Sequence, residues 1–273
     1  MNYSIFYFSG TGNTWYAAQK LKLALGKNHV SCYSIENDYL KDNLESIIEA
    51  SDQIIIGYPI YGSEAPRIMQ TFINDLPTMK VTKPLAVFCT QAFMSGDGAN
   101  YLSDVFLKKG YHLMQTLELK MSNNFYVPVF VRAFKVGNRE KINRRNEKAH
   151  EKIIEFAGQI RQGEAAVKSV NDIQNWLGDT QRKHMDTYIE KVNESIYADN
   201  TCTKCGMCVK LCPVENIKLT DKITFSNHCI ACMRCYQSCP KASIQITDAS
   251  KDLDKYPRFK GPIDKFDFNV LKV

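Results

Sequence analysis

The chain has 273 residues, 44% hydrophobic and 23% charged, a composition typical of a globular protein with room for two compact domains. No apolar run approaches the roughly 20 residues that a membrane-spanning helix needs. The N-terminus lacks the basic region of a signal peptide, so we expect a cytoplasmic protein. The net charge of +6 divides into −2 for residues 1–119 and +4 for each of 120–195 and 196–273. Because acidic residues alternate with the basic ones, this charge indicates solvated helices and argues against nucleic-acid binding.

Residues 1–121 alternate between apolar runs of strand length and segments of helical periodicity. We expect strands over 3–8, 30–35, 53–58, 85–90 and 113–121, and helices over 15–25, 42–49, 66–76 and 98–108. Five strands with helices between them predict an α/β fold with a doubly wound, parallel five-stranded sheet. An amphipathic helix over 138–161 is a candidate for the last helix of this fold.

A glycine-rich loop lies between the first expected strand and the first expected helix. It reads Ser9-Gly10-Thr11-Gly12-Asn13-Thr14, so the backbone can fold closely around an anion while hydroxyls and helix amides supply hydrogen-bond donors. The loop has no lysine, and Trp15 stands where a dinucleotide fingerprint has its third glycine. The loop therefore predicts a site for a phosphate monoester, and neither an NTPase P-loop nor a dinucleotide site.

The segment from Phe6 to Thr14 resembles the FMN-phosphate signature of flavodoxins, and the resemblance extends over about residues 3–121. It implies the flavodoxin-like strand order, with FMN at the switch point of the sheet. It also implies that the loops after the third and fourth strands approach the flavin, with Tyr61 and Phe93 beside the ring and Gly62 allowing the backbone to rearrange. The residues expected to bind FMN are Ser9, Gly10, Thr11, Gly12, Asn13, Thr14, Pro59, Ile60, Tyr61, Gly62, Thr90, Gln91, Ala92, Phe93, Gly96, Asp97 and Gly98.

Three further segments lack a chemical motif. Residues 122–137 contain an apolar, aromatic stretch that either covers the flavin or packs between domains. Residues 163–195 are polar with a helical pattern, and we expect a linker there. The tail, 251–273, spaces aromatic residues among charged ones and is expected to wrap the surface.

Eight of the ten cysteines lie between Cys202 and Cys239, in an internal repeat with an offset of 27 residues. Each half reads C-x2-C-x2-C-x3-C-P and is followed by a short expected strand. In a reducing compartment such clustering favours metal ligands over disulfides. A pair of zinc sites is the alternative, but zinc sites usually use two cysteine pairs and not a triplet with a distant fourth ligand.

Three cysteines separated by two residues each can surround three corners of an iron–sulfur cubane, while the fourth leads away to the other cluster. The pattern thus predicts two [4Fe–4S] clusters, one held by Cys202, Cys205, Cys208 and Cys239 and the other by Cys229, Cys232, Cys235 and Cys212. Residues 197–248 resemble bacterial two-cluster ferredoxins, which implies a small α+β domain and one-electron transfer at low potential.

The expected organisation is a flavodoxin-like FMN domain at 1–163, a helical linker at 164–196, a two-cluster ferredoxin domain at 197–250 and a tail at 251–273. Together these parts predict an iron–sulfur flavoprotein that carries electrons between the clusters and FMN, with a redox partner protein or a small-molecule electron acceptor. Two alternatives stay open: an FMN-dependent reductase of a small molecule fed by the clusters, and a non-catalytic redox sensor. No acid or base with a partner stands out in the flavin loops, so no catalytic residue is predicted.

Overall fold

The computed structural model describes residues 1–26, 30–128 and 135–272. Its larger part is a five-stranded parallel sheet in the order β2-β1-β3-β4-β5. The strands are β1 (Tyr3–Tyr7), β2 (Val30–Ser34), β3 (Gln53–Pro59), β4 (Lys83–Gln91) and β5 (Tyr111–Lys120). The strand order reverses beside β1, so the sheet has a topological switch point between β1 and β3. The predicted doubly wound α/β fold is confirmed.

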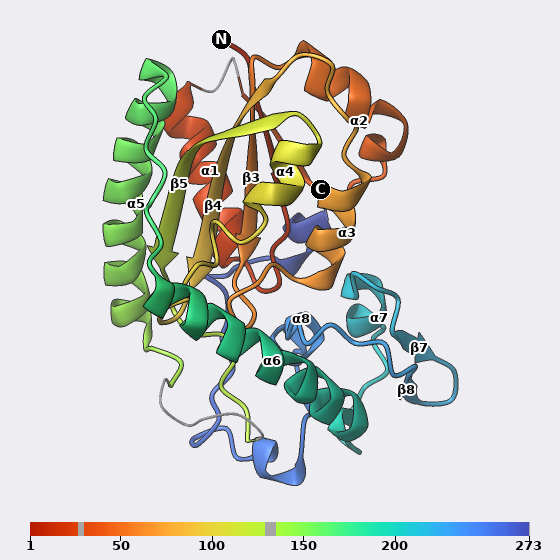
Figure 1. Ribbon diagram of the computed structural model, residues 1–273. Coiled ribbons are helices and arrows are strands. Elements are labelled where there is room, and N and C mark those ends of the chain that lie inside the picture. The colour runs from red at the N-terminus through yellow and green to blue at the C-terminus, as the bar shows by residue number, and fades with distance from the viewer. Residues whose placement is uncertain (27–29, 129–134, 273) are drawn as a thin grey trace.

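Helices cover both faces of the sheet (Figure 1). On one face lie α1 (Asn13–Leu25) and α5 (Arg139–Gln162), and on the other α2 (Tyr39–Ala50), α3 (Arg67–Asp75) and α4 (Ser103–Lys108). β1 and the residue after it supply both cores, with Ile5 and Tyr7 packed toward α1 and α5, and Phe6 and Phe8 packed toward the other layer. A strand buried on both faces needs apolar side chains in both directions, which explains its continuous apolar run.

The long helix α6 (Asp172–Ser195) crosses the molecule below the carboxyl ends of the strands (Figure 1). A capping box between Asn171 and Gln174 fixes its start. The helical pattern predicted over 163–195 therefore applies to 172–195 only. The residues before it pair with the edge of β5, where the Ala166 amide donates to the Met114 carbonyl at 2.8 Å and the Ala166 carbonyl accepts from Thr116 at 3.1 Å.

The cysteine-rich part is a small α+β unit, as predicted. Its antiparallel pairs are β6 (Tyr197–Ala198) with β9 (Ile244–Gln245) and β7 (Ile217–Leu219) with β8 (Ile223–Phe225), and its helices are α7 (Met207–Leu211) and α8 (Arg234–Ser238). The backbone repeats the 27-residue offset of the sequence. Positive φ angles occur in matching pairs at Lys204 and Ala231, Gly206 and Met233, and Glu215 and Ala242.

The tail returns to the sheet and joins the two parts of the molecule. A short 3-10 helix, η2 (Asp248–Lys251), leads into it, and a second one, η3 (Phe268–Lys272), lies near its end. The Ser34 hydroxyl on β2 donates to the Leu271 carbonyl at 2.8 Å, while Phe268 and Leu271 pack against Leu211 of α7. The tail thus wraps back onto the first domain.

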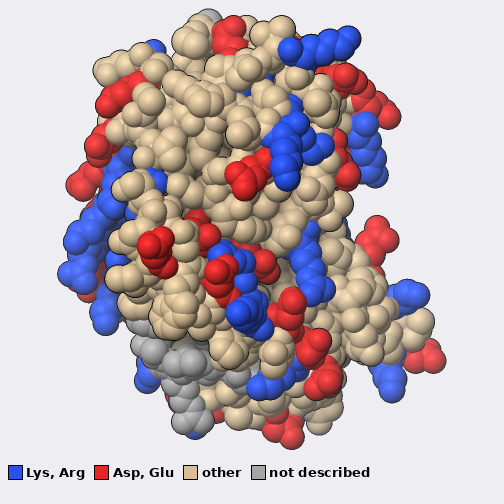
Figure 2. Space-filling view, viewed as in Figure 1, with Lys and Arg blue, Asp and Glu red and all other residues tan. Residues whose placement is uncertain are grey.

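Basic and acidic side chains are intermixed over the face shown in Figure 2. Several pair directly, as Arg67 does with Asp186 at 2.6 Å, which agrees with the solvated character predicted from the charge pattern. In the part of the chain that the structure describes, no helix is both long and apolar enough to cross a membrane.

Candidate functional site

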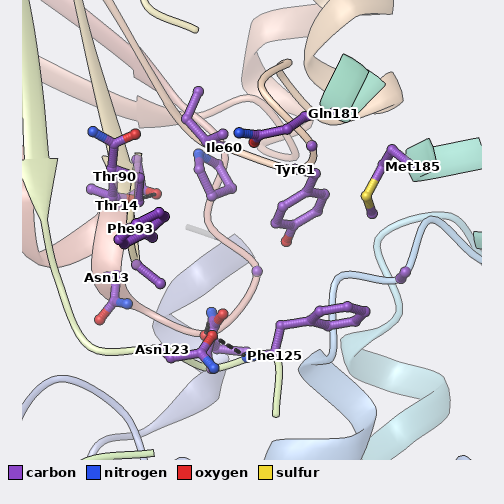
Figure 3. Close-up of a pocket in the computed structure, with 18 of the residues that line it drawn as sticks. Asn13, Thr14, Ile60, Tyr61, Thr90, Phe93, Asn123, Phe125, Gln181 and Met185 are labelled. Atoms are coloured by element: carbon purple, nitrogen blue, oxygen red, sulfur yellow. Dashed lines mark hydrogen bonds between the residues drawn. The ribbon is translucent and has the colours of Figure 1, made fainter. Parts of the chain in front are cut away.

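A cavity of about 420 Å³ lies at the carboxyl ends of the strands, next to the switch point. Its volume is within the range of about 300–1,000 Å³ that is usual for ligand sites. Its walls come from the Ser9–Thr14 loop, the loops after β3 and β4, residues 122–125, α6, and Ala231 of the cysteine-rich part. Figure 3 shows Thr14, Thr90 and Phe93 at one side of the cavity, with Phe125 and Met185 at the other.

The Ser9–Thr14 loop is buried and held in place by its neighbours. The Ser9 hydroxyl accepts from the Gly12 amide at 3.1 Å, and the Thr14 and Thr90 hydroxyls share a hydrogen bond of 2.8 Å. By contrast, the amides of Thr11, Asn13 and Thr14 have no acceptor among the described residues. Because α1 begins at Asn13, these amides lie at or just before its N-terminus, where the positive end of the helix dipole also lies. The loop can therefore bind an anion.

Other polar atoms at the cavity also lack partners. Asn13 Oδ1, Gln91 Oε1 and Ser122 Oγ are buried, and no hydrogen bond satisfies them. All three residues line the cavity. Leaving such groups unpaired costs free energy, so a bound polar molecule is the natural partner for them. An anion-binding loop joined to a mostly apolar cavity with a few polar atoms fits FMN.

The cavity brings together thirteen of the seventeen residues predicted to bind FMN. They are Ser9, Gly10, Thr11, Asn13, Thr14, Pro59, Ile60, Tyr61, Gly62, Thr90, Gln91, Ala92 and Phe93. The other four, Gly12, Gly96, Asp97 and Gly98, do not line it. A methyl group on Gly12 would lie 2.6 Å from Pro262 of the tail. Asp97 instead binds Arg182 of α6 through two hydrogen bonds of 2.8 and 3.0 Å, which fixes the helix over the cavity.

Sequence reasoning missed several lining residues. Those outside the predicted set are Met94, Ser122, Asn123, Asn124, Phe125, Thr180, Gln181, His184, Met185, Tyr188 and Ala231. Met94 belongs to the loop after β4 that the sequence already predicts near the flavin. The aromatic stretch of 122–137 was the signal for residues 122–125, and its first part does face the cavity, through Phe125. Val127 packs in the core of the cysteine-rich part, so the stretch also joins the domains. Its residues 129–134 lie outside the described ones.

The eight clustered cysteines line two small cavities in two sets of four, the outer cage and the inner cage. The outer cage surrounds one small cavity with Cys202, Cys205, Cys208 and Cys239, and the inner cage surrounds another with Cys212, Cys229, Cys232 and Cys235. Each cage therefore takes three cysteines from one half of the repeat and the fourth from the other half, which is the arrangement that the sequence predicts for crossed ligation.

Backbone amides point at the cage sulfurs. The Sγ atoms of Cys212 and Cys239 each accept a hydrogen bond at 3.2 Å, from Asn216 and Ser243 respectively. Burial raises the pKa of Cys232 to about 12, so its free thiol is neutral at physiological pH and must release a proton to bind metal. Sulfur ligands with amide donors around them fit iron–sulfur clusters.

The inner cage touches the FMN cavity. Ala231, beside Cys232, lines the cavity directly. A methyl group added to Gly10 would lie 2.7 Å from the Cys232 carbonyl oxygen and 2.5 Å from the Tyr61 hydroxyl, so only glycine permits this approach. Burial, with a smaller contribution from Cys232, raises the pKa of Tyr61 well above its usual value.

Arg234, within the inner repeat, links the cage to the phosphate loop. Its side chain is fully buried. The guanidinium binds the two carboxylate oxygens of Glu36 at 2.6 and 2.8 Å and donates to the carbonyls of Ser9, Gly10 and Leu211 at 2.8, 3.2 and 3.0 Å. The five N–H groups of the guanidinium are thus satisfied, and one side chain fixes the loop relative to the cage.

Comparisons with known proteins agree with this geometry. A sequence model described as a flavodoxin domain matches residues 4–155, and a 4Fe–4S dicluster domain matches residues 194–240. A Nostoc sp. protein named diflavin flavoprotein A 4 is 32% identical over 126 residues, which cover 45% of this chain and 22% of that protein. The chain thus spans about a fifth of this curated relative.

Two solved structures are also similar. The flavodoxin, WrbA-like protein from Agrobacterium tumefaciens is 19% identical, with a TM-score of 0.39, over 60% of this chain and 99% of that one. Oxidised flavodoxin 2 from Bacillus cereus is 22% identical, with a TM-score of 0.41, over 59% of this chain and 99% of that one.

Proposed function

The chain belongs to the flavodoxin domain family and also carries a 4Fe–4S dicluster domain, and from this we propose that it carries electrons between two [4Fe–4S] clusters and FMN. When bound, each cluster would supply one-electron chemistry and the flavin both one- and two-electron chemistry. The observation that supports this most is the contact between the inner cage and the phosphate loop, where a methyl group on Gly10 would lie 2.7 Å from the Cys232 carbonyl.

Each group has its own residues in this proposal. The Ser9–Thr14 loop would bind the FMN phosphate through the free amides at the start of α1. The loops after β3 and β4, together with α6, would enclose the flavin ring. The outer and inner cages would each bind one cluster.

The two cages differ in their access to solvent, and this difference suggests the direction of electron transfer. Cys205 of the outer cage is exposed, whereas Cys232 at the same position of the inner cage is buried. A redox partner protein can therefore approach the outer cage. We expect electrons to enter there and to reach the flavin through the inner cage, so that the chain links a one-electron donor to a two-electron acceptor.

Anaerobic purification followed by stopped-flow reduction tests this function. The protein should contain about eight iron atoms and one FMN, and a reduced ferredoxin-type donor should reduce the flavin rapidly. In Cys205→Ala, which disables the outer cage, the same donor should reduce the flavin at least about tenfold more slowly. Equal rates would contradict the proposed order, while protein with clusters and no flavin would favour a redox sensor.

A second candidate function is an FMN-dependent reductase fed by the clusters. The observation in its favour is that Thr180, Gln181 and His184 of α6 line the cavity and add polar groups to it. Turnover of quinones or nitroaromatic compounds with a reduced one-electron donor would support it. His184→Ala should then lower turnover while the FMN content stays unchanged.

A further inference from the structure

Arg258 of the tail is a buried cation with an unusual environment. It is only 8% exposed, and its guanidinium lies over the Tyr236 ring at 3.4 Å from the centroid. Its Nη2 atom donates to the carbonyls of Ala242 and Ile244 and to Gln245 Oε1, at 3.0–3.2 Å. Its Nε and Nη1 atoms have no hydrogen-bond partner. Among the described residues, no carboxylate oxygen lies within 4.0 Å of it.

Comparison with Arg234 shows that Arg258 lacks a carboxylate partner. Arg234 is buried even more completely, but Glu36 neutralises it and all its N–H groups are satisfied. Burying a charge without a partner costs several kcal/mol. Burial lowers the pKa of Arg258 to about 10, so it is still protonated at neutral pH. Negative charge nearby would stabilise a cation buried in this way.

Arg258 contacts residues that line both cysteine cages, and these cages would carry negative charge once clusters are bound. Tyr236, on which the guanidinium stacks, directly follows Cys235 of the inner cage. Ile244, whose carbonyl Arg258 binds, lines the cavity of the outer cage. Of the charged groups near Arg258, Asp199 acts more strongly on its pKa than Cys235 does, but Asp199 is reached only through Gln245, which accepts from Arg258 at 3.0 Å and donates to Asp199 at 2.8 Å.

We propose that Arg258 is the charge-compensating residue of the two cages, and that its cation raises the reduction potential of the clusters bound there. The inference rests on the proposed binding of clusters by the eight cysteines. Four thiolates leave an oxidised cluster with a net charge of roughly −2, and reduction adds one more negative charge. A nearby buried cation stabilises the reduced form more than the oxidised form, and salt screens this interaction little.

EPR-monitored redox titration of Arg258→Gln tests the proposal, with Arg258→Lys as the variant that keeps the charge. The matched control is Lys251→Gln, which removes one positive charge from an exposed residue of the same tail that already pairs with Asp248 at 2.6 Å. In Arg258→Gln, the one-electron equilibrium of at least one cluster should shift about tenfold or more toward the oxidised form, which corresponds to about 59 mV. Arg258→Lys should retain most of the wild-type potential, and Lys251→Gln all of it.

Each outcome shows whether Arg258 acts through its charge or through its packing. Unchanged potentials in Arg258→Gln, or equal shifts in the Gln and Lys variants, would overturn the proposal. If Arg258→Gln fails to assemble clusters while Arg258→Lys assembles them, the charge is needed and the proposal is supported; if both fail, a packing role replaces it. Iron analysis of the wild-type protein separates these results from a failure of the proposed function, because without clusters the wild type itself would contain no iron.

Discussion

The two halves of the cysteine repeat share one backbone conformation but lie in different surroundings. At matching positions 27 residues apart, the outer half has Lys204, Cys205 and Met207, and the inner half has Ala231, Cys232 and Arg234. The outer half faces solvent, whereas the inner half is packed against the phosphate loop. The ligand spacing therefore determines the cage, while the side chains that differ between the halves, Lys204 and Met207 against Ala231 and Arg234, go with the difference between a cage at the solvent and a cage at the flavin site.

The largest expected effect comes from the ligands that cross between the halves. Cys212→Ser and Cys229→Ser should remove the same cluster signal, because both belong to the inner cage, and Cys239→Ser and Cys202→Ser should remove the other. Each variant should lose about four of about eight iron atoms. Iron analysis and low-temperature EPR provide the measurement.

Cys32→Ser is the control for these variants, since Cys32 lies on β2 outside both cages. Its iron content should equal that of the wild type. If Cys212→Ser removed the signal that Cys202→Ser removes, each half of the repeat would bind its own cluster and the two-cage comparison would be wrong.

Arg234→Met exchanges the inner residue for the one at the matching outer position. It leaves Glu36, which is 5% exposed, buried without its partner. We expect a loss of about 3–5 kcal/mol in the free energy of unfolding, measured by chemical denaturation. Met207→Leu at the matching outer position should cost less than about 1.5 kcal/mol. Similar losses in the two variants would show that the Arg234–Glu36 pair is not what distinguishes the halves.

The contrast between local and long-range features explains how much the sequence could predict. The cages and the phosphate loop depend on spacings of two or three residues and on a strand–loop–helix junction, so the local pattern was enough to predict which residues would form them. Gly12 and Asp97 were predicted as FMN contacts from the same loops, but packing against the tail and α6 holds them elsewhere. Which surface a loop residue faces depends on segments distant in the sequence.

The remaining walls of the cavity illustrate the same limit of prediction from sequence. The polar pattern of α6 indicates a helix, but it contains nothing that says which surface the helix covers. Ala166 lies in a stretch of helical pattern, yet its amide and carbonyl pair with the exposed edge of β5. Arg258 lies among other tail charges in the sequence, and only the fold shows it buried against the Tyr236 ring. Such roles arise from tertiary contacts and have no periodicity of their own.

A smaller effect is expected in the phosphate loop, against which the inner half of the repeat packs. Thr14→Val removes a buried hydroxyl at the start of α1, where the FMN phosphate would bind. FMN affinity should fall about ten- to a hundredfold, since hydrogen bonds to charged groups contribute about 1.5–3 kcal/mol. Fluorescence titration of flavin-free protein with FMN and riboflavin measures this. Riboflavin should bind weakly to both proteins, and equal affinities for FMN and riboflavin in the wild type would contradict the phosphate-loop assignment.

The smallest effect is expected at the rim of the outer half. Lys204 is exposed beside Cys205, whereas the matching inner residue is the buried Ala231. If an acidic one-electron donor docks there, Lys204→Glu should slow its reduction of the protein about two- to fivefold, the range of exposed charge pairs, and the difference should shrink as salt is added. Stopped-flow kinetics at several ionic strengths measures this rate. Lys152→Glu on α5 carries the same charge change on a helix far from the outer cage (Figure 1). Equal slowing in both variants would show that net charge, and not docking at the outer cage, controls the rate.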